Sequence, residues 1–232
     1  MTHVSYISSF SDVHLPIYGN KFFKGFENIK DPLYFYAENF NKDDAFDFYE
    51  TIPHHKEFYE YIKNLQNKTT DKKEKRRLDK GLRWSYKSYV IIHALESIDT
   101  DYLIWIDGDV QVLKTPPDNL CQNLCGDKLM FGFEESVARM KHIESGFVIF
   151  NKNHPNINLI LDGYKEGYYD KKVLDLPKPW DSFWLANLTN RPGIKEFCVL
   201  KKGPFNCIKE WFYHDVGKEK FTNTNVNKYL GR

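Results

Sequence analysis

The sequence predicts a single α/β domain in which helices flank a central, mostly parallel sheet. Short apolar segments rich in β-branched and aromatic residues alternate with segments of helical period, an order typical of parallel sheets. A chain of 232 residues with 41% hydrophobic content is long enough for one substantial core. Since neither an internal repeat nor a clear linker interrupts the pattern, residues 1–232 are expected to form one domain.

The first strand is expected at residues 4–10, a helix at 18–29 and a second strand at 32–37. Strand, helix and strand in this order predict a parallel pair, and ligands of such sheets bind beyond the carboxyl ends of the strands. Position at that edge makes four residues candidates for ligand binding: Ser8, Ser9, Phe10 and Glu38.

A polar segment of helical character follows at residues 43–80, and an amphipathic helix is expected at 82–98. The cation-rich end of the polar segment also holds acidic residues, which favours a solvated surface. Arg83 and Lys87 are four residues apart and share a helix face. They are either a diphosphate-binding pair or two surface cations.

The continuous apolar run at residues 102–106 predicts a strand buried on both faces, and it ends at Asp107, Gly108 and Asp109. In extended geometry the two carboxylates point to the same side, and the glycine lets the backbone turn or approach a ligand. Paired carboxylates suit Mg²⁺ or Mn²⁺, ions that often share their coordination with substrate phosphates. The alternative is an ordinary turn.

The second half is expected to hold strands near residues 129–133 and 147–151 and helices near 120–124, 155–168 and 182–188. A polar turn, Glu144-Ser145-Gly146, precedes the second of these strands, and Asp181 stands where a helix begins.

A second cluster of polar residues lies near the end of the chain. His214 can bind a metal, Gly217 lets backbone amides approach an anion, and Lys220 offers a charge for phosphate. Taken alone, the cluster also fits an ordinary polar surface.

Together, Asp107-Gly108-Asp109 and the later His214, Gly217 and Lys220 resemble the Asp-X-Asp and His-X-X-Gly-X-X-Lys motifs of GT-A nucleotide-sugar-dependent glycosyltransferases. The likeness is to the branch of glycogenin and bacterial lipopolysaccharide galactosyltransferases, and the small size is similar to stand-alone bacterial or viral members. The segment from Glu144 to residue 151 is similar to the family's Asn-Ser-Gly segment, with Glu144 in place of Asn. The family's downstream Asp-Gln pair is present only as Asp181-Ser182.

The resemblance implies a GT-A fold with a nucleotide-binding half, 1–113, and an acceptor-binding half, 114–232, that carries the late motif. It implies Mn²⁺ or Mg²⁺ held by Asp107, Asp109 and His214, a nucleotide-diphosphate sugar donor, most simply a UDP-sugar, and a hydroxyl acceptor. Asp181 is the first candidate for the catalytic base and Glu144 the second; in a retaining enzyme either would stabilise an oxocarbenium-like state. The proposed contacts of the nucleotide sugar are Ser8, Ser9, Phe10, Glu38, Arg83, Lys87, Gly108, Gly217 and Lys220.

Three other functions fit parts of the pattern. A haloacid-dehalogenase-like phosphatase would use Asp107 as nucleophile and Asp109 as acid and base, although its nucleophile loop usually follows the first strand of the fold. A sugar-phosphate nucleotidyltransferase lacks support, because no glycine-rich basic signature follows the first strand. A binding module without turnover would need the same metal ligands as the transferase.

The formal net charge of +1 gives no reason to expect non-specific binding to nucleic acid. The sequence shows neither a signal-like N-terminus nor an apolar run of membrane-spanning length, so the expectation is a soluble, cytoplasmic protein. The sequence leaves the oligomeric state open.

Overall fold

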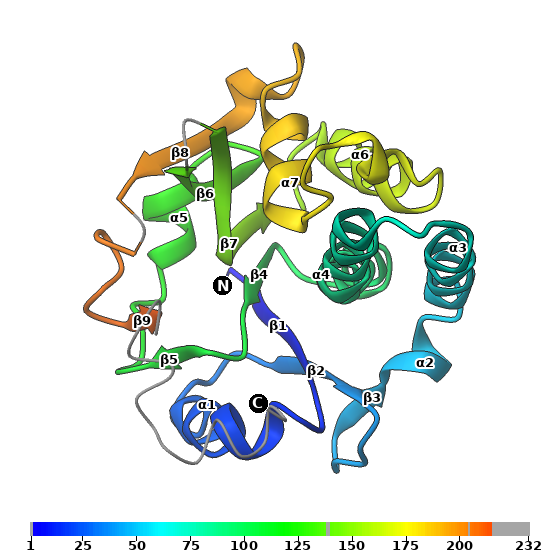
Figure 1. Cartoon of the computed structure of the whole chain (residues 1–232). Coiled ribbons are helices and arrows are strands. Elements are labelled where there is room, and N and C mark those ends of the chain that lie inside the picture. Colours follow the sequence, from blue (N-terminus) through cyan, green and yellow to red (C-terminus); the bar gives the residue numbers. More distant parts are fainter. Residues whose placement is uncertain (1, 138–139, 204, 215–232) are drawn as a thin grey trace.

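The computed structural model describes residues 2–137, 140–203 and 205–214. Within them a seven-stranded sheet has the strand order β3-β2-β1-β4-β7-β6-β8 (Figure 1). Four neighbouring strands of the first half run parallel: β1 (Val4–Ser11), β2 (Leu33–Glu38), β3 (Ala45–Asp47) and β4 (Tyr102–Ile106). β7 (Met140–Asn151) lies antiparallel to β4 and to β6 (Met130–Val137), and β8 (Cys198–Lys202) runs parallel to β6. The prediction of a mostly parallel sheet is confirmed.

Helices cover both faces of this sheet (Figure 1). One face packs against α1 (Asn20–Phe26) and α5 (Leu120–Cys125). The other packs against α3 (His55–Lys68), α4 (Lys72–Ser97), α6 (Ile157–Tyr168) and α7 (Asp181–Thr189). Side chains of β4 alternate between the two cores, Leu103 and Trp105 on one face and Ile104 and Ile106 on the other, which explains its uninterrupted apolar sequence.

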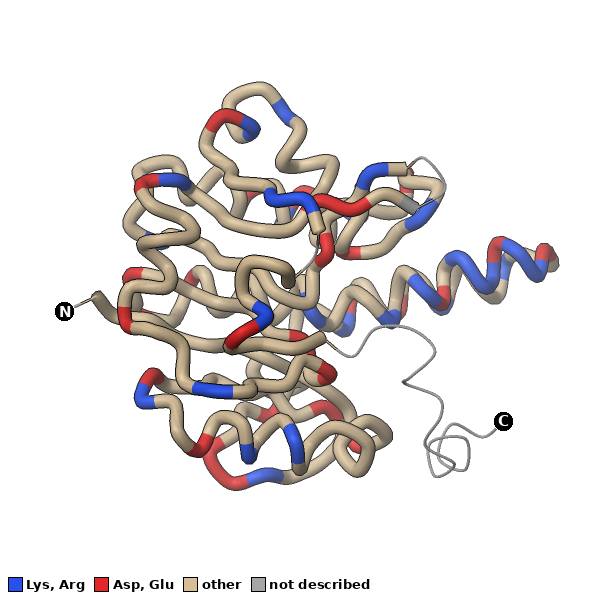
Figure 2. Tube along the Cα trace, turned by 90° about the vertical axis from the view of Figure 1, so that its left-hand side faces the viewer, with Lys and Arg blue, Asp and Glu red and all other residues tan. Residues whose placement is uncertain are grey.

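The helix α4 is longer than expected. It includes both the end of the polar segment 43–80 and nearly all of the helix expected at 82–98. It has 26 residues and is capped by Asp71, whose side chain accepts a hydrogen bond from the Lys73 amide at 2.8 Å. Its first half is mostly exposed and carries charges of both signs (Figure 2), as expected for a solvated helix. Its second half is buried and crosses the sheet next to β1 and β4.

Other predicted boundaries also differ. The helix expected at 18–29 is a short π-helix, η1 (Leu15–Gly19), followed by α1. β7 extends well before residue 147, because its polar first half pairs with β6 as an antiparallel ribbon. The very short elements β3, α2 (Phe48–Thr51), β5 (Val110–Val112) and β9 (Phe212–His214) were not predicted, nor were the 3₁₀-helices η2 (Lys172–Asp175) and η3 (Lys195–Phe197).

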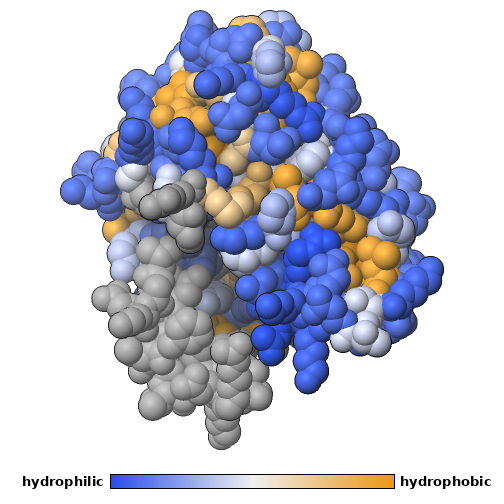
Figure 3. Space-filling model, turned by 45° about the horizontal axis from the view of Figure 1, so that its top comes forward, coloured by the Kyte–Doolittle hydropathy of each residue, from blue (hydrophilic) through white to orange (hydrophobic). Residues whose placement is uncertain are grey.

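Hydrophilic residues separate the apolar ones into patches on the face shown in Figure 3. None of the described helices combines the length and the apolar composition needed to cross a bilayer.

Candidate functional site

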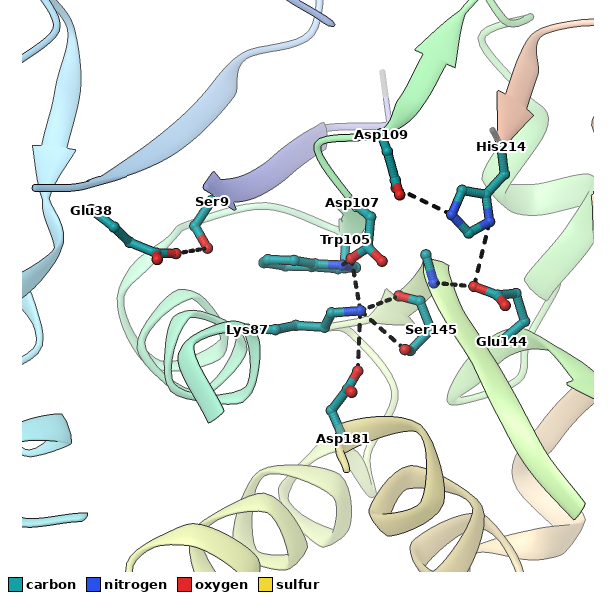
Figure 4. A network of polar contacts seen from close by, with 11 residues as sticks. Ser9, Glu38, Lys87, Trp105, Asp107, Asp109, Glu144, Ser145, Asp181 and His214 are labelled. Carbon is teal, nitrogen blue, oxygen red and sulfur yellow. Dashed lines mark hydrogen bonds and ion pairs between the residues drawn. The ribbon is translucent and has the colours of Figure 1, made fainter. Parts of the chain in front are cut away.

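The site lies where the carboxyl ends of β1, β2 and β4 meet the middle of β7. β4 and β7 are antiparallel with Ile106 opposite Phe147, so that Asp107 leaves the strand beside Gly146. The Asp107 amide donates a hydrogen bond to the Gly146 carbonyl at 2.9 Å. The polar turn and the Asp-Gly-Asp segment, far apart in the sequence, are thereby brought together (Figure 4).

Asp107, Asp109 and His214 form a possible metal site among the described residues. One ligand atom from each lies within 4.8 Å of the others. His214 is delivered by β9, which pairs antiparallel with β5 directly after Asp109, with Val110 opposite His214. Two carboxylates and one imidazole form a donor set suited to a divalent ion such as Mn²⁺.

Both ring nitrogens of His214 face carboxylates. Nε2 lies 3.1 Å from Oδ1 of Asp109, and Nδ1 lies 3.5 Å from Oε1 of Glu144 (Figure 4). The same Glu144 oxygen accepts a hydrogen bond from the Gly146 amide at 2.9 Å. Burial lowers the pKa of His214, but the hydrogen bond and charge of Asp109, together with the charge of Glu144, outweigh this and raise it above its ordinary value.

Gly146 lets the imidazole approach the backbone of β7. A Cβ atom at this position would lie 3.0 Å from Cε1 of His214 and 3.0 Å from Oε1 of Glu144. Any larger residue would therefore displace one of the two side chains.

Lys87, on the buried half of α4, connects the metal cluster to α7. Its Nζ lies 2.7 Å from Oδ1 of Asp107 and 3.1 Å from Oδ2 of Asp181 (Figure 4). It also donates to the carbonyl and the hydroxyl of Ser145, at 3.0 Å each. Burial lowers the pKa of Lys87, but the two carboxylates outweigh it and leave the pKa above its ordinary value.

The same oxygen of Asp107 also accepts a hydrogen bond from Trp105, whose Nε1 donates to Oδ1 at 2.6 Å. Burial raises the pKa of Asp107, and the Lys87 ammonium opposes that shift. Trp105 and Ser145, which also belong to the site, were not predicted from the sequence. Trp105 could have been identified from the sequence, because it is two residues before Asp107 and residues two apart in a strand share a face. Ser145 could have been identified only from its position between Glu144 and Gly146.

The N-terminal candidates lie beside this network. The Ser9 hydroxyl donates to Oε1 of Glu38 at 3.0 Å (Figure 4), and burial raises the pKa of Glu38 to about 7 despite that bond. The Ser8 side chain is fully buried. Phe10 belongs to a buried aromatic cluster and packs against Gly108, where a Cβ atom would lie 2.4 Å from its ring. Phe10 thus supports the turn through packing.

The structure does not bring Arg83 to the site. Its side chain is 67% exposed and lies 3.8 Å from Asp79, whereas Lys87 on the same helix is buried in the network. Gly217 and Lys220 lie outside the described residues.

No protein-family model and no curated protein matches the chain. Solved structures match it in fold. A glycosyltransferase involved in the glycosylation of the major capsid of PBCV-1 superposes with a TM-score of 0.56 at 13% identity, over 99% of this chain and 100% of that one. The glycosyltransferase GlyE of Streptococcus pneumoniae gives 0.52 at 9% identity, over 100% of this chain but 60% of its own. Mouse xyloside xylosyltransferase 1 gives 0.51 at 7% identity, over 86% and 84% of the two chains. The predicted GT-A fold is confirmed.

Proposed function

We propose that the chain is a metal-dependent glycosyltransferase that moves a sugar from a nucleotide-diphosphate sugar, preferably a UDP-sugar, to a hydroxyl group of a glycan, lipid or protein. The observation that carries the proposal is the convergence of Asp107, Asp109 and His214 at the carboxyl ends of the parallel strands. The glycosyltransferases described above share this fold, which supports the same assignment.

Mn²⁺ or Mg²⁺ would be held by these three residues and, when bound, would supply Lewis-acid stabilisation of the charge on the leaving diphosphate. Glu144 has the contacts of a residue that orients the histidine, since its carboxylate faces the nitrogen that points away from Asp109. We therefore assign Glu144 a positioning role ahead of the role of base.

Asp181 remains the first candidate for the group that acts on the acceptor or on the sugar. It is buried at the first turn of α7, where the helix dipole favours a carboxylate. Lys87 fixes its distance from the metal cluster, because one ammonium contacts both Asp181 and Asp107. A proton-accepting or charge-stabilising carboxylate is thereby held next to the position of the leaving group.

The test is a calorimetric titration of the protein with UDP and GDP, with Mn²⁺ present and then chelated. We expect Mn²⁺-dependent binding of UDP, its loss in Asp109→Ala, and its retention in Asp99→Ala, which changes an exposed carboxylate before β4. Absence of Mn²⁺-dependent binding of either nucleotide by the unchanged protein contradicts the proposal. Hydrolysis of a phosphomonoester that Asp107→Asn abolishes would instead identify a phosphatase. Nucleotide binding without transfer to any acceptor would identify a binding module.

A further inference from the structure

A cavity that is open to solvent lies next to the start of α7. It has a volume of about 490 Å³, and its wall includes Lys141, Lys178, Phe183, Asn187 and Arg191. With Asn190, which also lines it, the cavity combines three cations, an aromatic ring and two amides. No carboxylate belongs to the wall formed by the described residues.

Lys178 differs from the other two cations of the wall in its contacts. Lys141 pairs with Glu134 at 3.1 Å, and Arg191 pairs with Glu166. The Lys178 ammonium instead lies over two rings, 4.9 Å from the centre of Phe183 and 5.3 Å from that of Trp180. Within residues 2–137, 140–203 and 205–214 it has no carboxylate within ion-pair distance. The rings stabilise the ammonium without neutralising its charge, so that Lys178 can still pair with an anionic ligand.

The cavity adjoins the candidate site through two elements that pack against each other, α7 and β7 (Figure 1). Phe183 is two residues after Asp181, roughly 3 Å farther along the helix axis and about 200° around it, so the two side chains leave opposite sides of the first turn of α7. Lys141 is four residues before Ser145, roughly 13 Å along the strand. An oligosaccharide can bridge such a distance.

We propose that this cavity binds an anionic group of the acceptor, namely a sugar carboxylate or a sugar phosphate, while a hydroxyl of the same acceptor reaches Asp181. The inference rests on the proposed glycosyl transfer and specifies its acceptor. Lys178 supplies the charge, Phe183 and Trp180 hold its ammonium in place, and the Asn187 amide offers hydrogen bonds to hydroxyl groups.

The test is a ligand-observed NMR titration with three probes: methyl glucuronide, glucose 6-phosphate and the neutral methyl glucoside. We expect at least one anionic probe to bind about fivefold more tightly than the neutral one, the effect of one partly exposed ion pair. Comparison of the two anionic probes distinguishes carboxylate from phosphate. Lys178→Gln should remove the preference, and Lys178→Arg should retain it. Lys21→Gln, which removes an exposed charge on α1, should have no effect.

Equal affinity for charged and neutral probes, a preference that survives in Lys178→Gln, or no binding of any probe would overturn the inference. Mn²⁺-dependent binding of UDP is measured on the same variants. If nucleotide binding is intact and the anion preference is absent, only the acceptor assignment fails. If nucleotide binding is absent in the unchanged protein, the proposed function itself fails.

Discussion

Glu38 gives a test of the geometry at the carboxyl end of β2. Its carboxyl group accepts a hydrogen bond from Ser9, yet burial raises its pKa from 4.5 to about 7. Between these two values the folded protein binds a proton at Glu38 that the unfolded chain does not bind. The contribution of Glu38 to stability is therefore greatest below the unfolded pKa and is lost as the pH rises through 7.

The full shift corresponds to about 3 kcal/mol of unfolding free energy, and partial exposure of the side chain reduces it to on the order of 2 kcal/mol. Glu38→Gln retains an oxygen that accepts from Ser9 but cannot ionise. We expect this variant to be more stable than the unchanged protein by on the order of 2 kcal/mol at about pH 8, and by less than about 1 kcal/mol at about pH 5.

Urea unfolding followed by circular dichroism at the two pH values measures the difference. Glu60→Gln, at an exposed position of α3, controls for the loss of one negative charge. A Glu38→Gln variant that is equally affected at both pH values, or destabilised at the higher one, would refute the reasoning.

Three further substitutions test the site. Lys87→Met leaves two buried carboxylates without their shared cation, so urea unfolding should show a loss of about 3 kcal/mol or more; a loss below about 1 kcal/mol contradicts the bridging role. Gly146→Ala should weaken Mn²⁺ binding about tenfold in calorimetry, because the new methyl group crowds both His214 and the Glu144 carboxylate that faces it, and unchanged affinity would refute this. Gly108→Ala should lower the unfolding free energy by about 1–3 kcal/mol, because the Phe10 ring must move to make room for the new methyl group. Thermal unfolding measures the change, and an unchanged midpoint temperature would refute the expected clash.

Elements with a strong local pattern were predictable. β4 has five consecutive buried residues, and no polar residue within it gives another interpretation. β3, β5 and β9 have three residues each, too few for either period to be detected. The first half of β7 was missed because it is polar and is held by pairing with β6, an interaction that a local pattern does not record.

The residues of the candidate site also differ in how far the sequence predicts them. Asp107 and Asp109 were identifiable because strand geometry alone directs them to one edge. His214 was assigned to the same site through the resemblance of the two motifs to those of GT-A glycosyltransferases. The register of β5 with β9 explains physically why His214 meets the two aspartates. Lys87 was expected at a diphosphate as a partner of Arg83. Its ion pair with Asp181 depends on how α4 and α7 pack together, which helical spacing does not specify.

The pairing of β5 with β9 also determines how a metal ion could enter and leave. Two of the three proposed ligands lie in the turn directly after β4, whereas the third is attached through a ribbon of three residues per strand. A ribbon of three residues per strand has few backbone hydrogen bonds, although Val110 and Phe212 within it are fully buried, and such short elements can open locally below the global unfolding free energy. Exchange of the ion should therefore follow the opening of this ribbon. Hydrogen exchange at Leu113, whose amide donates to the Trp211 carbonyl at the end of the ribbon, should slow when Mn²⁺ is added while that of β4 stays unchanged.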